Sequence, residues 1–414
     1  MLRDGLSTQG QFAASGSSVA RARGRISFDQ RVARYRRRAA TGVVVAVTAP
    51  VILGFGALTI DLGRLYVAKN ELQVSADAAA LAGVSAYVGT TGQAVTLAQT
   101  SFDSHDTLAT QINTRTRTYA GYNRSNSKET KVADQDIVKG RYSFTNPSAS
   151  LDSSSTARFN AVQVTLSRTS GGVNEPVNYL FGPILGLKSG QAHASATAAV
   201  NDRMAGYDVT LGTAPMLPFT IGKTLYDQMV ATGSDAYAYN SSSGQVIAAP
   251  DGIREVDIFP VNTGASGNLG LLYVPTSGGG TNTRLRDQID NNISNDDIES
   301  TFHTTNLVFT QPDGSPVTYG VYGEPGLRST LESDVNQRVG DVVGIFLHSS
   351  FTGSGSNTLF TIVGIRFVRI MHVDLSGTTK HLYVQPVVYA GPGLTVQNSA
   401  PSTNGNVGVL MLVR

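Results

Sequence analysis

The longest apolar pattern in the chain runs from Ala39 to Ile60, 22 residues without a charge, of which ten are Val, Ile, Leu or Phe. A helix of this length spans about 33 Å, enough to cross a bilayer core of about 30 Å. The pattern therefore predicts a transmembrane helix over residues 39–60. A cleaved signal peptide and a buried core helix are the alternatives, but the apolar part of a signal peptide is shorter, about 7–15 residues.

Helical periodicity continues past this span to Val88 and predicts an extended amphipathic helix over residues 61–88. A 4-3 spacing places one apolar seam on a single face, interrupted by Lys69. Between residues 76 and 86 the seam contains only small side chains, so another backbone could approach closely. That neighbour is either another copy of the chain or the protein's own globular domain. The seam consists of Leu58, Leu62, Leu65, Leu72, Ala76, Ala79, Gly83 and Ala86.

The pattern changes after residue 88 and predicts an α+β domain over residues 89–205. Residues 89–135 are polar, with a helix expected at 93–102 and irregular or edge-strand structure after it. Alternation of apolar and polar residues then indicates strands at 136–144, 159–167 and 190–200. A short apolar turn or helix is expected at 179–187.

A boundary at 201–206 leads into a β-rich C-terminal domain over residues 206–414. Glycine- and serine-rich loops separate its short apolar runs, and two helices are expected at 283–293 and 328–339. The fold class is therefore α+β, with one membrane helix continuing into a long helix, a small α+β region and a β-rich domain. The runs expected as strands are 216–221, 245–249, 255–261, 270–274, 342–347, 359–373, 381–389 and 407–413.

Charge predicts the orientation in the membrane. Residues 1–40 contain nine Arg and two Asp, a net charge of +7, so a whole-chain charge of +2 leaves −5 for the remainder. Arg36, Arg37 and Arg38 directly precede the span, and positive residues stay on the cytoplasmic side. A nucleic-acid-binding patch is the alternative for the arginine cluster. Its position next to the predicted span favours a role in setting the membrane orientation. Residues 1–38 are expected to form a disordered basic cytoplasmic tail.

Candidate chemistry is sparse, and no enzyme activity, cofactor or metal is expected. The chain has no cysteine, and its six histidines form no tight metal-binding pair. No serine has the setting of a nucleophile elbow. His348, His372 and His381 are interpreted as ordinary surface histidines and not as a metal cluster. A loop, turn or helix cap is favoured for the remaining groups: Asp103 with His105 and Asp106; the turn Asp374 to Thr378; and the acidic residues Asp287, Asp290, Asp296, Asp297 and Glu299.

A family resemblance rests on residues at the end of the span and just beyond it. The segment contains Pro50 and Gly54, then Asp61-Leu62-Gly63-Arg64-Leu65-Tyr66, then Leu72-Gln73 and Ala76-Asp77-Ala78-Ala79-Ala80-Leu81-Ala82-Gly83. Residues 38–86 resemble the N-terminal region of the TadE/TadG-like tight-adherence (Tad, or Flp) pilus-assembly proteins. Residues 159–200 are similar to the following segment of this group. The chain departs from pilin-like members because no Glu follows Gly42 five residues on.

The resemblance implies a single-pass protein of the bacterial inner membrane with its C-terminal bulk in the periplasm. It implies a non-enzymatic subunit of a Tad/Flp pilus assembly or secretion system. The expected partners are other pilus-assembly or envelope subunits, the lipid bilayer and copies of the chain, with no nucleic acid. A membrane-anchored adhesin or carbohydrate-binding envelope protein is the alternative. The residues expected to support helix packing and assembly are Pro50, Gly54, Gly56, Asp61, Gly63, Tyr66, Leu72, Gln73, Ala76, Asp77, Ala79, Ala80 and Gly83.

Overall fold

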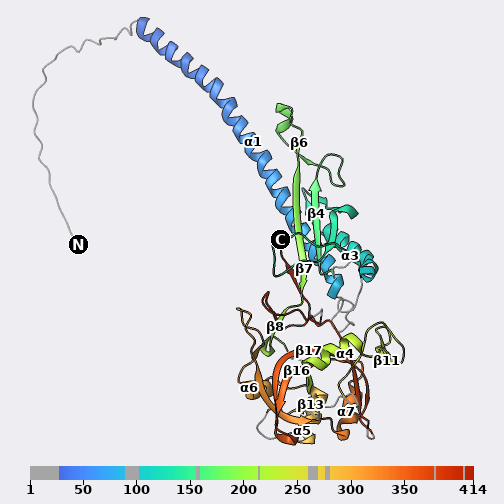
Figure 1. Ribbon diagram of the computed structural model, residues 1–414. Coiled ribbons are helices and arrows are strands. Elements are labelled where there is room, and N and C mark those ends of the chain that lie inside the picture. Colours follow the sequence, from blue (N-terminus) through green and yellow to red (C-terminus); the bar gives the residue numbers. More distant parts are fainter. Residues whose placement is uncertain are drawn as a thin grey trace, which may run out of the picture.

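One long helix dominates the N-terminal part of the computed structural model (Figure 1). The structure describes residues 28–88, 102–154, 159–212, 215–259, 269–275, 280–376, 379–403 and 406–414. Helix α1, Phe28–Val88, is continuous over 61 residues. Its predicted extension to Val88 is confirmed. The disordered tail predicted up to residue 38 is wrong for residues 28–38, where a segment without Gly or Pro, rich in Arg, continues the helix.

The two halves of α1 differ in their surroundings. In the N-terminal half, Val43, Leu53 and Phe55 are 65–71% exposed, whereas Leu72 and Ala76 in the C-terminal half are fully buried. By length and composition α1 could cross a membrane, and none of its most apolar part is buried in the structure. The helix is therefore a candidate membrane anchor at one end and a core element at the other.

A four-stranded antiparallel sheet packs on the C-terminal half of α1, together with α3 (Phe102–Tyr122). The strand order is β20-β7-β4-β3, and β4 pairs with β7 along its whole length. The bounds are β3 Ile137–Gly140, β4 Ala161–Arg168, β7 Ala192–Asn201 and β20 Val409–Leu412. The strands predicted at 159–167 and 190–200 are confirmed, and the one predicted at 136–144 is shorter.

Helix α3 was not expected. The helix predicted at 93–102 lies outside the described residues except for Phe102. The irregular or edge-strand structure expected after it is wrong for residues 103–122, where α3 lies, and is confirmed for 123–135, which contain two short strands and loop. The buried residues Ile112, Thr116 and Ala120 recur every four positions and form one narrow stripe against α1. Because this stripe contains so few apolar residues, the helical period is weak in the sequence.

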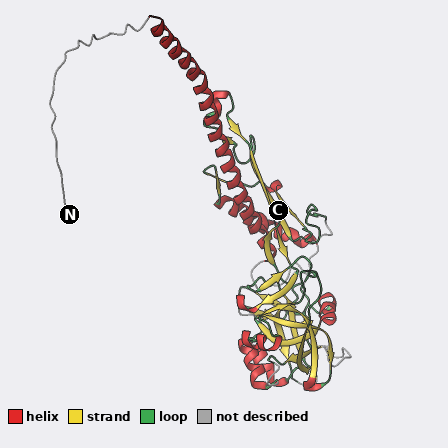
Figure 2. Ribbon diagram, turned by 90° about the vertical axis from the view of Figure 1, so that its left-hand side faces the viewer, coloured by secondary structure: helices red, strands yellow, loops and turns green. Residues whose placement is uncertain are grey.

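Two small hairpins flank this sheet. Strands β1 (Arg124–Ser125) and β2 (Lys128–Glu129) form one, and β5 (Val177–Asn178) and β6 (Ser189–Gly190) form the other. The second hairpin includes the 3-10 helix η2, Gly182–Leu185, where the sequence predicted a short apolar turn or helix. Figures 1 and 2 show this hairpin at the end of the sheet that lies toward the N-terminal half of α1.

The C-terminal part is a β-barrel. Strands β17, β15, β13, β9 and β16 pair in that order, and β16 also pairs with β17 and so closes the ring. Strands β18 and β12 extend the sheet beyond β17. The bounds are β9 Met216–Gly222, β12 Val256–Asp257, β13 Leu269–Leu272, β15 Tyr319–Pro325, β16 Val342–Thr352, β17 Thr358–Asp374 and β18 His381–Pro386.

Short helices lie around the barrel. They are α4 Lys223–Thr232, α5 Asn282–Asn291, α6 Asn295–Phe302 and α7 Glu332–Gln337. Helices α5 and α7 fall where the sequence predicted them, whereas α4 and α6 were not predicted. A separate hairpin pairs β10 (Ala238–Asn240) with β11 (Gln245–Ile247). A three-stranded sheet of β14 (Asn306–Val308), β8 (Met204–Asp208) and β19 (Leu394–Val396) lies between the barrel and the first sheet.

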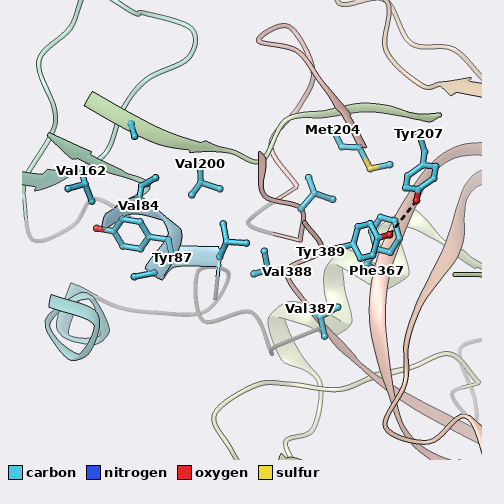
Figure 3. Packing of buried hydrophobic residues seen from close by; sticks show 14 of the residues in the cluster. Val84, Tyr87, Val162, Val200, Met204, Tyr207, Phe367, Val387, Val388 and Tyr389 are labelled. Carbon is cyan, nitrogen blue, oxygen red and sulfur yellow. Dashed lines mark hydrogen bonds between the residues drawn. The ribbon is translucent and has the colours of Figure 1, made fainter. Parts of the chain in front are cut away.

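The last strand links the two parts of the protein. The sequence placed it in the C-terminal domain, but β20 pairs with β7 of the first sheet, Val409 opposite Asn201. The chain leaves the first sheet at the predicted boundary, residues 201–206, but returns to it at β20. The boundary therefore does not divide the chain into two independent segments. A single buried cluster continues from Val84 and Tyr87 through Val200 and Val388 to Phe367, Tyr389 and Tyr207 (Figure 3).

Candidate functional site

The small residues of the apolar span lie on an open surface. A Cβ atom placed on Gly54, Gly56 or Gly63 would meet nothing within 4 Å, and Pro50 is exposed. Arg36, Arg37 and Arg38 lie in α1 ahead of this span. The N-terminal half of α1 therefore presents small side chains that would let a neighbouring helix approach closely.

Asp61, the first residue after the span, fastens a distant loop to α1. Its side chain is almost fully buried and accepts backbone N–H bonds from Leu180 (2.6 Å), Phe181 (3.0 Å) and Gly182 (2.7 Å). These amides lie at the start of η2, where N–H groups lack partners within the helix. The sequence predicted an interfacial polar contact for Asp61. The structure shows that its contact is with the protein's own backbone.

These hydrogen bonds set the acidity of Asp61. Burial raises the pKa of the carboxyl group, but the backbone donors of Leu180, Gly182 and Phe181, together with the charge of Arg64, outweigh burial and lower it overall. Because the folded-state pKa is lowered, the contribution of the carboxylate to stability is fully present above the ordinary value of 3.8. It is lost as the pH falls below that value.

We therefore expect the attachment of the loop to be independent of pH above about 4 and to be released in stronger acid. The amide proton shifts of Leu180 and Gly182, followed by NMR in detergent micelles, should stay constant above this pH and change together below it. Asp61→Asn is the control, because it has no carboxyl group to titrate. A transition between about pH 5 and 7 in the parent protein would contradict this assignment.

The small-residue seam packs against the protein's own domain. Leu72, Ala76, Ala79 and Ala80 are fully buried, and α1 contacts α3, β4 and β7 along this segment. A Cβ atom on Gly83 would collide with Thr116 Oγ1 of α3 and lie 3.2 Å from Val162 Cγ1 of β4. Of the two neighbours left open by the sequence, the structure therefore shows the globular domain of the same chain.

Gln73 links α1 to the sheet, and Asp77 is its neighbour on the helix. The Gln73 side-chain amide donates to Asp77 Oδ1 (2.8 Å) and to the Ser195 carbonyl of β7 (3.1 Å). The two residues are four apart, so they lie on the same face of the helix. Asp77 thus orients the Gln73 side chain that hydrogen-bonds to β7.

A different face of α1 stays open beyond the span. Tyr66, Val67 and Val74 are 54–67% exposed. A shallow groove of about 280 Å³ is lined by Val67, Asn70, Glu71, Val74, Asn123 and Arg124. Residues 67, 70, 71 and 74 have the spacing of one helix face. We call these four residues the open stripe.

Arg168 is a buried structural residue that sequence reasoning missed. Its guanidinium donates to Ser125 Oγ (3.1 Å) and to the carbonyls of Ser125, Glu175 (3.0 Å) and Lys128 (3.4 Å). Burial lowers its pKa, opposed by the nearby Glu71 and Glu175 charges. The alternation of β4 puts Arg168 on the same inward face as Val164 and Leu166, which was the available signal.

The remaining sequence candidates do not assemble into a metal site. Within the described part of the chain, no group of three or more His, Asp or Glu residues could hold a metal ion. The surface position expected for His348 is wrong, because this side chain is buried within β16 and hydrogen-bonds to Thr220 (2.9 Å). His372 and His381 stack on Tyr383.

The acidic candidates fall in a turn, in the first turn of α6, or within helices, as Asp287 and Asp290 do in α5 and Glu299 in α6. Asp374 accepts bonds from Ser376 in the predicted β17–β18 hairpin turn, of which residues 377–378 lie outside the described part. Asp296 and Asp297 occupy the first turn of α6, after the cap Ser294. The side chains of Asp103, His105 and Asp106 also lie outside the described part.

Comparison with known families finds matches over most of α1 and the sheet that packs on it. Residues 39–86 match the family described as putative Flp pilus-assembly TadE/G-like, and residues 67–198 match the family described as putative Tad-like Flp pilus-assembly. The resemblance to Tad-type pilus-assembly proteins is thus confirmed, and it covers α1, α3 and most of the first sheet. No curated protein and no solved structure matched the chain. The barrel lies beyond both matched segments.

Proposed function

We propose that this protein is a non-enzymatic, single-pass subunit of the bacterial inner membrane that acts in Tad/Flp pilus assembly. Its N-terminus lies in the cytoplasm, and its sheet and barrel lie in the periplasm. The family match supports a role in pilus assembly. The charge difference across the span supports the orientation.

The observation that carries this proposal is the continuity of α1. The same helix exposes an apolar, charge-free segment and then supplies Leu72, Ala76 and Ala80 to the core of the globular part. A membrane anchor joined to its domain by a flexible linker would leave that domain free to rotate. Here the domain is fixed to the anchor, so it holds a set orientation relative to the bilayer.

We further propose that partner subunits dock on the open stripe of α1. Leu72 and the small residues of the seam are already covered by the protein's own sheet and α3. The open stripe combines exposed Val67 and Val74 with a groove that a side chain from another helix could fill. Gly56, which lies on the same face of α1 as Val67 and Val74, would continue the contact within the bilayer.

The test is site-specific photo-crosslinking from Val67 in native membranes, with Leu211 as the control position. Val67 is 54% exposed and Leu211 is 63% exposed, so both positions tolerate a photoreactive residue. We expect crosslinks from Val67 to Tad or Flp components or to a second copy of the chain, and none from Leu211. Failure to recover any pilus component from Val67 would contradict an assembly role through this face.

The alternative function, binding of an envelope polysaccharide, has one specific location in its favour. A groove of about 770 Å³ on the barrel is lined by Tyr273, Tyr322, Glu324, Arg328 and Asn357, among others. Arg328 pairs with Glu324, and the Tyr273 hydroxyl donates to Glu324 (2.9 Å). Aromatic rings beside fixed polar groups suit a sugar. Sedimentation with purified envelope polysaccharide, abolished by Tyr322→Ala, would favour this alternative.

A further inference from the structure

An exposed apolar loop lies between β5 and β6. Residues 179–187, here called the apolar loop, contain no charged side chain and are followed directly by Lys188. Leu180, Ile184, Leu185 and Leu187 are 57–81% exposed. Four large aliphatic side chains so close together are unfavourable in water, because each would be stabilised by burial of its apolar surface. Such a cluster indicates a surface that is covered in the working protein.

The backbone of the apolar loop is satisfied from within the protein. Asp61 accepts the amides of Leu180, Phe181 and Gly182, and Pro183 has no N–H to donate. The loop is closed by Tyr179 N to Lys188 O, Ile184 N to Phe181 O, Gly186 N to Pro183 O and Leu187 N to Gly182 O, all 3.0–3.1 Å. Gly186 supplies the positive φ of +81° at the end of η2. A segment that leaves few free N–H groups can enter an apolar medium at low cost.

Asp61 determines where along α1 this loop lies. It immediately follows the charge-free span, so it marks the end of the segment proposed to cross the bilayer. The loop is held at this level by hydrogen bonds to its backbone, and Figure 1 shows it on the side of the sheet that faces the N-terminal half of α1. The loop's apolar side chains are therefore level with the outer edge of the proposed span.

We propose that the apolar loop inserts into the outer surface of the inner membrane, beside α1, as a second membrane contact. Its aliphatic side chains would enter the boundary between headgroups and acyl chains, and Phe181 and Tyr179 would lie at the interface, where aromatic residues are favoured. Lys188 would reach the phosphates of anionic lipids. This proposal rests on the proposed membrane anchoring of α1. It adds a second contact that prevents the periplasmic part from tilting about the anchor.

The absence of cysteine allows a clean depth measurement on the full-length protein. Ile184→Cys, Phe55→Cys and Leu211→Cys, each labelled with the fluorophore NBD, would be reconstituted in nanodiscs of phosphatidylcholine and phosphatidylglycerol with and without doxyl-labelled lipid. Phe55 reports on the anchor, Ile184 on the loop, and Leu211 is an exposed control distant in sequence from both. We expect the doxyl lipid to reduce fluorescence about twofold or more at Phe55 and Ile184 and to leave Leu211 unchanged.

The outcomes separate the two proposals. Quenching at Phe55 but not at Ile184 would overturn membrane insertion of the loop and leave the anchor intact. No quenching at Phe55 would overturn the anchor and the insertion that depends on it. A blue-shifted Ile184 signal that lipid does not quench would mean that the loop is covered by protein, which also overturns the proposal. Introducing Asp61→Asn into the labelled Ile184→Cys variant should reduce quenching, because the loop loses its attachment.

Discussion

Replacing Leu72 by Ala is expected to lower the free energy of unfolding of the globular part by about 3 kcal/mol. Leu72 is fully buried where α1 packs on the sheet, so the substitution removes apolar contacts and leaves a cavity. Val74→Ala, two residues further along the same helix, is the matched control, because Val74 is 59% exposed. Its effect should be within about 0.5 kcal/mol of zero.

Urea unfolding of the two variants in detergent micelles, followed by circular dichroism, measures this difference. A large loss of stability in Leu72→Ala with little change in Val74→Ala would place the C-terminal half of α1 in the core. Equal effects of the two substitutions would mean that this half of the helix does not pack on the sheet. That result would contradict the rigid connection between anchor and domain.

Replacing Arg168 by Met is expected to destabilise the protein by about 3 kcal/mol or more. Met keeps the aliphatic part of the side chain but leaves buried carbonyl groups of Ser125 and Glu175 without their donor, at about 1–3 kcal/mol for each unpaired group. Arg168→Lys should recover only part of the loss, because an ammonium group cannot match the planar fork of donors.

The same unfolding assay checks this prediction, with Arg141→Met as an exposed control. Unchanged stability in Arg168→Met would contradict the prediction. It would show that the hydrogen bonds of the buried guanidinium are offset by the cost of removing its charge from water. Arg168 joins β4 to the β1–β2 hairpin, so Arg168→Met should also increase proteolysis at residues 124–129. Arg141→Met should leave proteolysis at these residues unchanged.

The sequence was most informative where one period extended over many residues. The apolar span and the 4-3 seam predicted α1 as far as Val88, and alternation predicted β4 and β7 within a few residues. Helix α3 was not predicted, because its inward stripe includes Thr116 and few large apolar side chains. The barrel could be recognised as β-rich, but its closure could not. Closure depends on β16 pairing with both β9 and β17, a long-range arrangement that no local pattern contains.

In the candidate site, too, local contacts could be predicted from the sequence and long-range contacts could not. Gln73 and Asp77 are four residues apart, so their proximity follows from the helix alone. The partners of Asp61 lie about 120 residues further along the chain, in a segment that the sequence described only as a short apolar turn. The role of Asp61 could therefore not be derived from its neighbours. The sequence also did not show what the small-residue seam packs against. Small residues allow a close backbone contact equally well within one chain and between two chains.

The most direct test of the central claim is the labelling of single cysteines along α1 with a membrane-impermeant maleimide. The claim is that one helix crosses the membrane and then enters the periplasmic core. In intact spheroplasts we expect Tyr66→Cys to react, Phe55→Cys to stay unlabelled, and Ser17→Cys to react only after lysis. Tyr66 and Phe55 are both about two-thirds exposed in the structure, so only a bilayer would distinguish them. Equal labelling of Phe55→Cys and Tyr66→Cys, or labelling of Ser17→Cys in intact spheroplasts, would contradict the claim.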